Sequence, residues 1–415
     1  MTNPEIVIVG AGAAGIGAGL ELAARGVPFV ILEAMNRVGG RACTDRTSLP
    51  YAWDRGCHWL HNAMDNPLVP VAEAAGADID RGFTWENRGI WAKGVWLDLA
   101  ARRAAQDAIE DAFRAIDRAG ARGLDVPIAD ILPDAGAWAP LITHLLQLVD
   151  SADPWENSAQ GSADNDDSVD NWPVRSGYGA VIAGMAKDLP VRLSTPVTKI
   201  EQQAKGVRLT TAQGTLEAKA AIVTASTNVL TSGAIGFSNG PAKDLLDHVA
   251  EVPCGAYEKI AIAFDRSPFV EYGYQNATIM DPAGGAPLFL QLAHFGAPLA
   301  VVELGGSHAR ELRTAGEAAT LEFALEKLTQ AFGADIRKSV IAATMTHWSA
   351  EPFVRGAYSY VKPGARQRRQ DMITADTGTL AFAGEAFSAT GQATAHGAYL
   401  SGRDVAAKIA ERLRV

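Results

Sequence analysis

The residues with the clearest chemical potential form a glycine-rich turn and a single acid near the start of the chain. The turn reads GAGAAG over residues 10–15, and Glu33 follows it. Gly10 permits a tight turn, Gly12 lets a pyrophosphate approach the backbone, and Gly15 lets a helix pack closely on a strand. Free N–H groups at the helix start bind phosphate, and Glu33 can accept hydrogen bonds from ribose hydroxyls. The spacing predicts a dinucleotide site, and the acid disfavours NADP.

These residues need a βαβ unit to position them. Residues 5–9 read EIVIV, typical of a buried parallel strand, and VPFVIL over 27–32 predicts a second strand. An alanine-rich helix lies between the two strands and ends near Gly26. The sequence therefore predicts an α/β fold with a Rossmann-type nucleotide-binding lobe.

Composition limits the classes of partner. The chain has 415 residues, 48% of them hydrophobic, which predicts two folded domains or one bilobed unit. Its net charge of −10 argues against nucleic acid and anionic membranes as partners. No run of about 18 apolar residues predicts a membrane helix. The three cysteines form no CxxC pair, which favours a reducing, cytoplasmic location. The spacing of the histidines does not indicate a metal site. No sequence pattern indicates an oligomeric state.

Three longer motifs carry a family resemblance. They are EAMNRVGGR over residues 33–41, WSAEPFVRGAYSYV over 348–361 and FAGEAFSATGQATAHGAYLSG over 382–402. Together they resemble the flavin amine oxidase superfamily, with the motifs closest to its polyamine oxidase branch. Met35 departs from the arginine that several members carry there. The resemblance implies FAD as cofactor and an amine-oxidase-like fold, in which the FAD lobe is interleaved with an α+β substrate lobe.

The resemblance also implies which residues bind the cofactor. In the superfamily the arginine after the paired glycines holds the FAD phosphates, and the last helix starts beside the flavin. The expected FAD-binding residues are Gly10, Gly12, Ala14, Gly15, Glu33, Gly40, Arg41, Gly56, His58, Trp59, Val197, Trp348, Glu385, Thr394 and Ala395. Monoamine oxidases tether the flavin through a cysteine where this chain has Ala357, so the resemblance implies non-covalent FAD.

Four residues are expected to serve catalysis. Lys259 resembles the lysine that the family uses beside flavin N5, where a cation stabilises the reduced ring. Tyr358 and Trp348 resemble aromatic walls of the substrate cage, which exclude water from the amine. His61 matches a histidine that contacts substrate in some polyamine oxidases, although a histidine satisfied within the fold fits the sequence equally well. Thr394 replaces a second cage tyrosine of monoamine oxidases.

The rest of the chain divides between the two lobes. By resemblance, residues 1–66, 172–233 and 352–415 form the FAD lobe, and residues 67–171 and 234–351 form the substrate lobe. Residues 67–150 are predicted mainly helical, 172–230 predict a three-strand meander, and 401–413 predict a final helix. Residues 150–172 are acidic, which favours a solvated loop or, alternatively, a funnel for a cationic substrate.

The resemblance implies an amine oxidase. Its reaction would transfer a hydride from the amine α-carbon to flavin N5, hydrolyse the imine, and reoxidise the flavin with oxygen to give peroxide. The acidic composition favours a di- or polyamine substrate. Alternatives on the same fold are an L-amino-acid oxidase, which typically has an arginine where this chain reads Gly56-Cys57-His58-Trp59, and a porphyrinogen or polyene oxidase. A chromatin-binding role is disfavoured by the negative charge.

Overall fold

A parallel sheet builds the nucleotide-binding region in the computed structural model, which describes residues 4–84, 87–165, 170–281 and 284–413. Its strand order is β20-β13-β1-β2-β9, and every pairing is parallel. The strands are β1 (Ile6–Val9), β2 (Phe29–Leu32), β9 (Val191–Arg192), β13 (Ala220–Val223) and β20 (Leu380–Phe382). All four residues of β1 and of β13 are buried, as expected for a parallel sheet covered on both faces.

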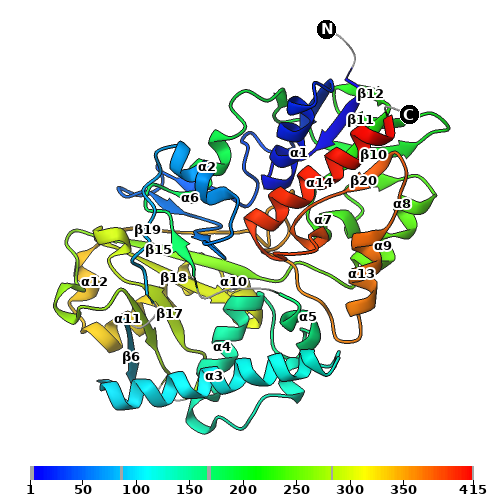
Figure 1. The fold of residues 1–415 in the computed structure, drawn as a ribbon. Helices are drawn as coiled ribbons and strands as arrows, with labels where there is room; N and C mark the ends of the chain where they lie inside the picture. Colours follow the sequence, from blue (N-terminus) through cyan, green and yellow to red (C-terminus); the bar gives the residue numbers. More distant parts are fainter. Residues whose placement is uncertain (1–3, 85–86, 166–169, 282–283, 414–415) are drawn as a thin grey trace.

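Two helices from opposite ends of the chain cover this sheet side by side (Figure 1). They are α1 (Ala13–Ala24) and α14 (Ala395–Leu413). Small residues allow their close approach, because a Cβ on Gly17 would overlap the carbonyl of Tyr399 and a Cβ on Gly402 would overlap that of Ala14. The final helix, predicted over 401–413, begins earlier, at Ala395.

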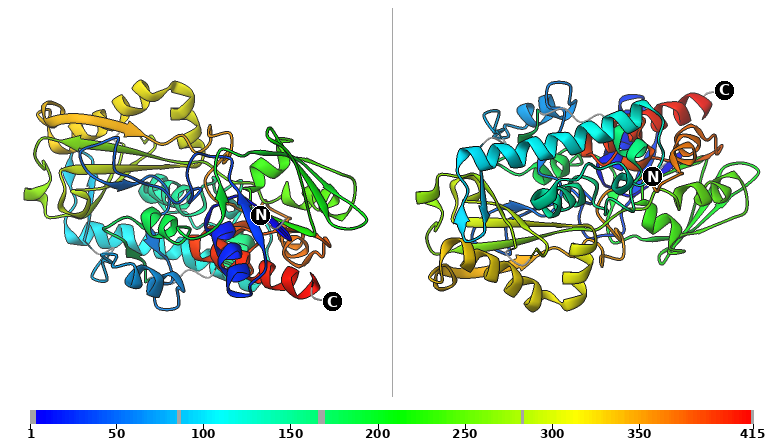
Figure 2. Two further views of the ribbon diagram at one scale, coloured as in Figure 1. Left: turned by 90° about the horizontal axis from the view of Figure 1, so that it is seen from above. Right: turned by 90° about the horizontal axis from the view of Figure 1, so that it is seen from below.

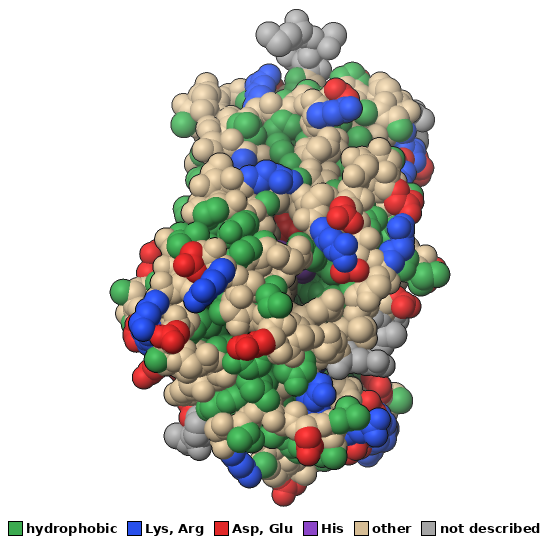
Figure 3. Space-filling view, turned by 90° about the vertical axis from the view of Figure 1, so that its left-hand side faces the viewer, with side chains coloured by type: hydrophobic (Ala, Val, Ile, Leu, Met, Phe, Trp, Pro, Cys, Tyr) green, Lys and Arg blue, Asp and Glu red, His purple; other side chains and the backbone are tan. Residues whose placement is uncertain are grey.

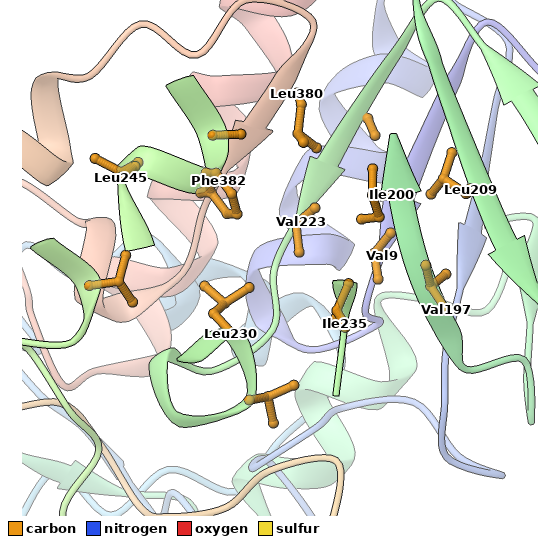
Figure 4. Close-up of a cluster of buried hydrophobic side chains, with 14 of the residues drawn as sticks. Val9, Val197, Ile200, Leu209, Val223, Leu230, Ile235, Leu245, Leu380 and Phe382 are labelled. Carbon is orange, nitrogen blue, oxygen red and sulfur yellow. The ribbon is translucent and has the colours of Figure 1, made fainter. Parts of the chain in front are cut away.

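A four-stranded sheet packs against the parallel one. It consists of β10 (Val197–Gln202), β11 (Val207–Thr211), β12 (Gly214–Ala218) and β14 (Gly236–Phe237), and β10 to β12 confirm the predicted meander. The register of β10 shifts after Val197, so Val197 and Ile200 both point into the core. Figure 4 shows these two residues and Leu209 facing Val9 and Val223 of the parallel sheet.

A seven-stranded mixed sheet lies at the other end of the molecule (Figures 1 and 2). Its order is β19-β15-β18-β17-β16-β6-β7. The strands are β6 (Arg88–Ala92), β7 (Val95–Trp96), β15 (Tyr257–Phe264), β16 (Asn276–Ile279), β17 (Leu288–Gln291), β18 (Leu299–Gly305) and β19 (Val340–Met345). The prediction of mainly helix for 67–150 is wrong for β6 and β7, which form a hairpin through Lys93 (φ 52°) and Gly94 (φ 84°).

The longer helices mostly flank this second sheet. They are α3 (Leu99–Ala121), α4 (Ala139–Asp150), α10 (Gly306–Ala315) and α11 (Glu317–Phe332), whereas the short helix α2 (Leu68–Ala74) packs beside α6 (Tyr178–Gly184). Helices α3 and α4 agree with the prediction of mainly helix for residues 67–150. Shorter elements complete the fold, among them α5 (Ala159–Ala163), α7 (Thr227–Thr231), α8 (Pro241–Asp244), α9 (Leu246–Val249), α12 (Ile336–Ser339), α13 (Arg366–Thr374), β3 (Thr44–Asp45), β4 (Trp53–Asp54), β5 (Trp59–Leu60) and β8 (Trp172–Pro173).

The α/β prediction is confirmed, with a Rossmann-type sheet interleaved in the chain with a second, mixed sheet. In the part of the chain that the structure describes, no helix combines the length and the apolar character needed to span a membrane.

Candidate active site

The glycine-rich turn has the geometry of a dinucleotide site. Gly10 has φ 104°, and a Cβ on Gly15 would overlap the carbonyl oxygen of Gly10. Gly40 (φ 57°) passes so close that a Cβ on it would lie 3.2 Å from the Cα of Gly12. Gly12 precedes α1 and has no side chain to cap its first N–H groups, which include that of Ala14. These N–H groups are therefore oriented to bind phosphate, and the residues fit FAD.

Glu33 is anchored at the end of β2. Its Oε2 accepts from the backbone N–H of Ala11 at 2.6 Å, and its Oε1 accepts from that of Met35 at 2.8 Å. Burial raises the pKa of this carboxyl, and the two backbone donors act in the opposite direction. Val197, another residue expected to bind FAD, is buried at the start of β10.

We expect Glu33→Ala to weaken FAD binding by about 10- to 100-fold. The change removes hydrogen bonds to a charged acceptor, each worth about 1.5–3 kcal/mol, and leaves the N–H of Ala11 without its acceptor. The measurement is the dissociation constant of FAD, from titration of the apoprotein. Glu217→Ala, which removes an exposed acid paired with Arg208, is the control and should bind FAD normally. Equal affinity in both variants would contradict the role of Glu33.

Arg41 and Glu385 form a partly buried ion pair between distant parts of the chain. Arg41 Nη1 lies 3.0 Å from Glu385 Oε1 and also donates to the carbonyl of Ala357. The other oxygen of Glu385 accepts from Ser359 Oγ at 2.7 Å and from the N–H of Ala393 at 3.1 Å. Both predicted cofactor residues thus meet, and Ser359 is an additional partner that the sequence reasoning missed.

Three successive carbonyls of a loop are held by the predicted lysine and tryptophan. Lys259 Nζ donates to the carbonyls of Gly56 at 2.8 Å and Asp54 at 3.2 Å, and Trp348 Nε1 donates to that of Arg55 at 3.0 Å. Lys259 lies on β15 and is only 4% exposed. Gly56 is required sterically, because a Cβ there would overlap the carbonyl of Arg41. Lys259, Trp348 and Gly56 therefore form one cluster, and the Arg41 backbone packs directly against Gly56.

Glu258, which the sequence reasoning missed, positions Trp348 from the opposite face of β15. Its carboxylate is 1% exposed and accepts from Thr346 Oγ1 at 2.6 Å and from the N–H groups of Trp348 and Ser349 at 2.9 Å. Adjacent strand residues point to opposite faces, so Glu258 and Lys259 bind different segments. The signal available in the sequence was two adjacent charges in an otherwise apolar strand.

We expect Glu258→Ala to lower the free energy of unfolding of the holoenzyme by about 3 kcal/mol or more. Three buried donors lose a charged acceptor, and each such loss costs about 1–3 kcal/mol. Urea unfolding measures the change. Glu258→Gln keeps one acceptor and should recover part of the stability, whereas Glu311→Gln at an exposed site should change it by no more than about 0.5 kcal/mol. An unchanged Glu258→Ala protein would show that the contacts do not matter.

Two tyrosines and a buried acid lie together beside Lys259. The rings of Tyr257 and Tyr358 are 5.8 Å apart at 46°, and the Tyr358 hydroxyl donates to the carbonyl of Leu148. Glu303 of β18 lies directly opposite Lys259 of β15, so the two side chains share a face of the sheet. Burial raises the pKa of both tyrosines, and Glu303 adds to the shift. Tyr358 was predicted here, whereas Tyr257 and Glu303 were not.

Glu303 lacks a cationic partner within the described residues. Its carboxylate is 5% exposed and accepts from Gln291 Nε2 at 2.8 Å. Among those residues no lysine, arginine or histidine nitrogen lies within 4.0 Å of it. Lys259 faces Glu303 across the two strands, but its ammonium donates to the carbonyls of Asp54 and Gly56. A buried carboxylate is costly unless hydrogen bonds or a positive charge stabilise it.

A cavity of ≈ 450 Å³ adjoins this cluster. His58 and Trp59, expected beside the flavin, line it together with His294 and Phe295. The other lining residues are Asp80, Phe83, Pro173, Arg175, Tyr274, Gln275, Asn276, Gln291, Leu292, Ala293 and Gly296. Burial lowers the pKa of His58, whose Nδ1 lies 3.5 Å from Asp54 Oδ2. Figure 3 shows one face of the molecule hollowed near its centre, with histidine and acidic surface inside the hollow.

The remaining predicted residues lie outside that cavity lining. His61 Nδ1 is 2.8 Å from Asn171 Oδ1, which satisfies one nitrogen within the fold. Thr394 Oγ1 accepts from the N–H of Gly397 at 3.0 Å, so Thr394 caps α14, and Ala395 is the first residue of that helix. In the described ranges no group of three or more histidine, cysteine or acidic side chains is arranged to hold a metal ion.

The acidic segment 150–172 is largely engaged in structural contacts. Asp153 and Glu156 pair with Arg310 at 2.7 and 2.9 Å, and Asp164 pairs with Arg366 at 2.7 Å. Asp153 is fully buried and Asp150 is 7% exposed, so the expectation of a solvated loop is wrong for these two. Asp166 and Asp167 lie outside the described residues. The paired carboxylates stabilise this segment and have their charge compensated locally.

The site fits the class of flavin-dependent oxidoreductases, with a nucleotide-binding turn, a partly buried Arg41–Glu385 pair and a second sheet. A family model described as flavin containing amine oxidoreductase matches residues 13–116 and 132–410, so the chain belongs to that family. The family confirms FAD as the cofactor.

Individual relatives agree with the family. Rice polyamine oxidase 4 is 26% identical over 99% of this chain and 89% of its own length. Human lysine-specific histone demethylase 2 is 26% identical over 98% of this chain, which spans 53% of that relative. Among solved structures, cyclohexylamine oxidase from Brevibacterium oxydans has a TM-score of 0.79 at 22% identity over the full length of both chains. A putrescine oxidase variant has a TM-score of 0.80 at 18% identity, covering 99% of each chain. These two structures support the fold.

Proposed function

We propose that this protein is an FAD-dependent oxidase of di- or polyamines. The observation that carries the proposal is Glu303, a buried carboxylate opposite Lys259 with no cationic partner in the described chain. A substrate with one reacting amine and a second, protonated amine would supply the missing positive charge. The FAD lobe would comprise residues 1–66, 172–233 and 352–415, and the substrate lobe residues 67–171 and 234–351.

Each side chain around Lys259 would have a separate role in the reaction. Bound FAD would accept a hydride at N5 from the amine α-carbon and would pass electrons on to oxygen, giving peroxide. Tyr257 and Tyr358 form an apolar wall that excludes water and favours the neutral form of the reacting amine. Lys259 adds a fixed positive charge, and Glu303 orients the substrate through its second amine.

The same charges disfavour an L-amino-acid oxidase. A substrate carboxylate would lie near the buried Glu303, and like charges repel in a low-dielectric site. Arg175 lines the cavity, but it pairs with Asp80 at 2.8 Å. An amine substrate therefore fits the described charges better than an amino acid.

Anaerobic mixing with a panel of amines tests the proposal. The panel holds putrescine, spermidine, spermine, acetylated polyamines, a simple aralkyl monoamine and several L-amino acids, with flavin absorbance as the signal. Bleaching by di- or polyamines at lower concentration than by the monoamine supports the proposal. Bleaching by amino acids alone, or by no amine, contradicts it and would favour the amino-acid or the porphyrinogen and polyene alternatives. Release of FAD into the supernatant after acid precipitation checks that the flavin is non-covalent.

A further inference from the structure

Two hydrogen bonds connect Glu303 through Gln291 to His294, which lines the cavity. Gln291 Nε2 lies 2.8 Å from Glu303 Oε1, and Gln291 Oε1 lies 2.8 Å from His294 Nδ1. A carboxylate only accepts hydrogen bonds, so the amide nitrogen must face Glu303 and the amide oxygen must face the imidazole. His294 Nδ1 therefore carries a proton and donates a hydrogen bond to Gln291 Oε1. In the neutral ring this leaves Nε2 as a hydrogen-bond acceptor.

The environment of His294 keeps the ring neutral. His294 is 5% exposed, and its ring centroid lies 5.1 Å from that of His58 and 4.3 Å from that of Phe295. Burial lowers its pKa well below the ordinary value, and the nearby Lys259 and His58 act in the same direction. His294 thus presents an acceptor rather than a positive charge to the cavity that it lines.

The backbone around His294 is strained in a way that indicates function. Ala293 has φ 44° and Phe295 has φ 52°, both in the left-handed region that residues with a side chain rarely adopt. Such strain persists where the surrounding structure fixes the conformation, and it is common at ligand sites. Here the two residues flank His294, whose ring is held by Gln291 and packs against His58 and Phe295.

The cavity wall suits a protonated amine on an alkyl chain. Trp59, Phe83, Tyr274 and Phe295 contribute aromatic rings, which attract cations through their faces and pack against methylene groups. The volume of ≈ 450 Å³ falls in the range of small-ligand sites. Asp80 contributes a carboxylate to the same wall, although it pairs with Arg175.

We propose that this cavity is a second amine subsite, in which His294 Nε2 accepts a hydrogen bond from the remote ammonium of a substrate longer than a diamine. The inference rests on the proposed function and extends it: Glu303 would bind the amine next to the reacting one, and His294 would bind the next amine along the chain. The subsite makes the enzyme prefer triamines and tetraamines over diamines.

The test compares spermidine with putrescine in the holoenzyme of His294→Leu, His294→Gln and wild type. We expect His294→Leu to raise KM for spermidine tenfold or more, and by a factor at least five times larger than any rise in KM for putrescine, because only spermidine reaches the cavity while both substrates depend on Glu303 behind Gln291. His294→Gln keeps an acceptor and should recover part of the spermidine affinity. Glu311→Gln, at an exposed site, is the control. Equal effects on both substrates, or no effect on either, would overturn the subsite.

A binding measurement separates this inference from the proposed function. If putrescine and spermidine do not reduce the wild-type flavin, the proposed oxidase function fails, and calorimetric titration with spermidine then tests the cavity by itself. Weaker binding of spermidine to His294→Leu than to wild type supports the subsite. Identical binding isotherms, or no binding to either protein, overturn it.

Discussion

Lys259→Met is expected to keep FAD bound but to lower turnover at least about 100-fold. Methionine has a similar length and fills the buried position, so the apolar packing around β15 is conserved. The ammonium is lost, and with it the fixed positive charge that the proposed reaction needs beside the flavin. Removing one electrostatic donor from an active site typically costs about 100- to 1000-fold in rate. Stopped-flow spectroscopy measures flavin reduction and reoxidation separately, and we expect the larger loss in reoxidation.

The structure also gives Lys259 a mechanical role, which the same experiment must separate from the chemical one. Its two hydrogen bonds to the carbonyls of Asp54 and Gly56 hold a loop beside the cofactor site. A merely structural role would show as lost FAD or lower stability with unchanged rates per bound flavin. Lys338→Met, at an exposed lysine paired with Asp335, is the control and should behave as wild type. Unchanged reduction and reoxidation in Lys259→Met would rule out the catalytic role.

Local patterns explain why the nucleotide-binding unit could be predicted from the sequence. The turn over 10–15, the acid at Glu33 and the flanking strands form one short unit, and each feature is visible within a few residues. The resemblance singled out Lys259, Trp348 and Glu385, and the structure brings the first two together at the loop of Gly56 and the third to Arg41. Chain elements with strong local signals were therefore predictable before any tertiary contact was known.

The substrate side depended on contacts that no local pattern reveals. A role for Glu303 can be inferred only from the antiparallel register of β15 and β18, which places it opposite Lys259. Its strand reads LAVVELG, so an isolated acid in a buried apolar run was the available signal. His294 likewise needs Gln291 and a strained turn before its protonation state can be deduced. The hairpin of β6 and β7 was missed because both strands are short and because β6 pairs with β16, far along the chain.

Glu303→Gln is expected to raise KM for putrescine by about 10- to 100-fold. Glutamine has nearly the same shape, so the variant removes the negative charge while preserving the packing of β18. A hydrogen bond to a charged group is worth about 1.5–3 kcal/mol, and each 1.4 kcal/mol corresponds to a tenfold change in affinity. The measurement is steady-state kinetics with putrescine and with a simple aralkyl monoamine. The monoamine has no second ammonium, so its KM should change by less than threefold.

The control for this charge is an acid from the segment 150–172. Glu156→Gln removes a carboxylate that is already paired with Arg310, so the substrate gains no charge from it and KM for both amines should stay unchanged. A selective rise in KM for putrescine in Glu303→Gln alone means that one buried carboxylate, rather than overall acidity, determines the preference for a diamine over a monoamine. An equal rise in KM for the monoamine would mean that Glu303 only supports the packing of the site. A rise in KM for putrescine in Glu156→Gln would instead support the alternative that the acidic segment 150–172 attracts the cationic substrate.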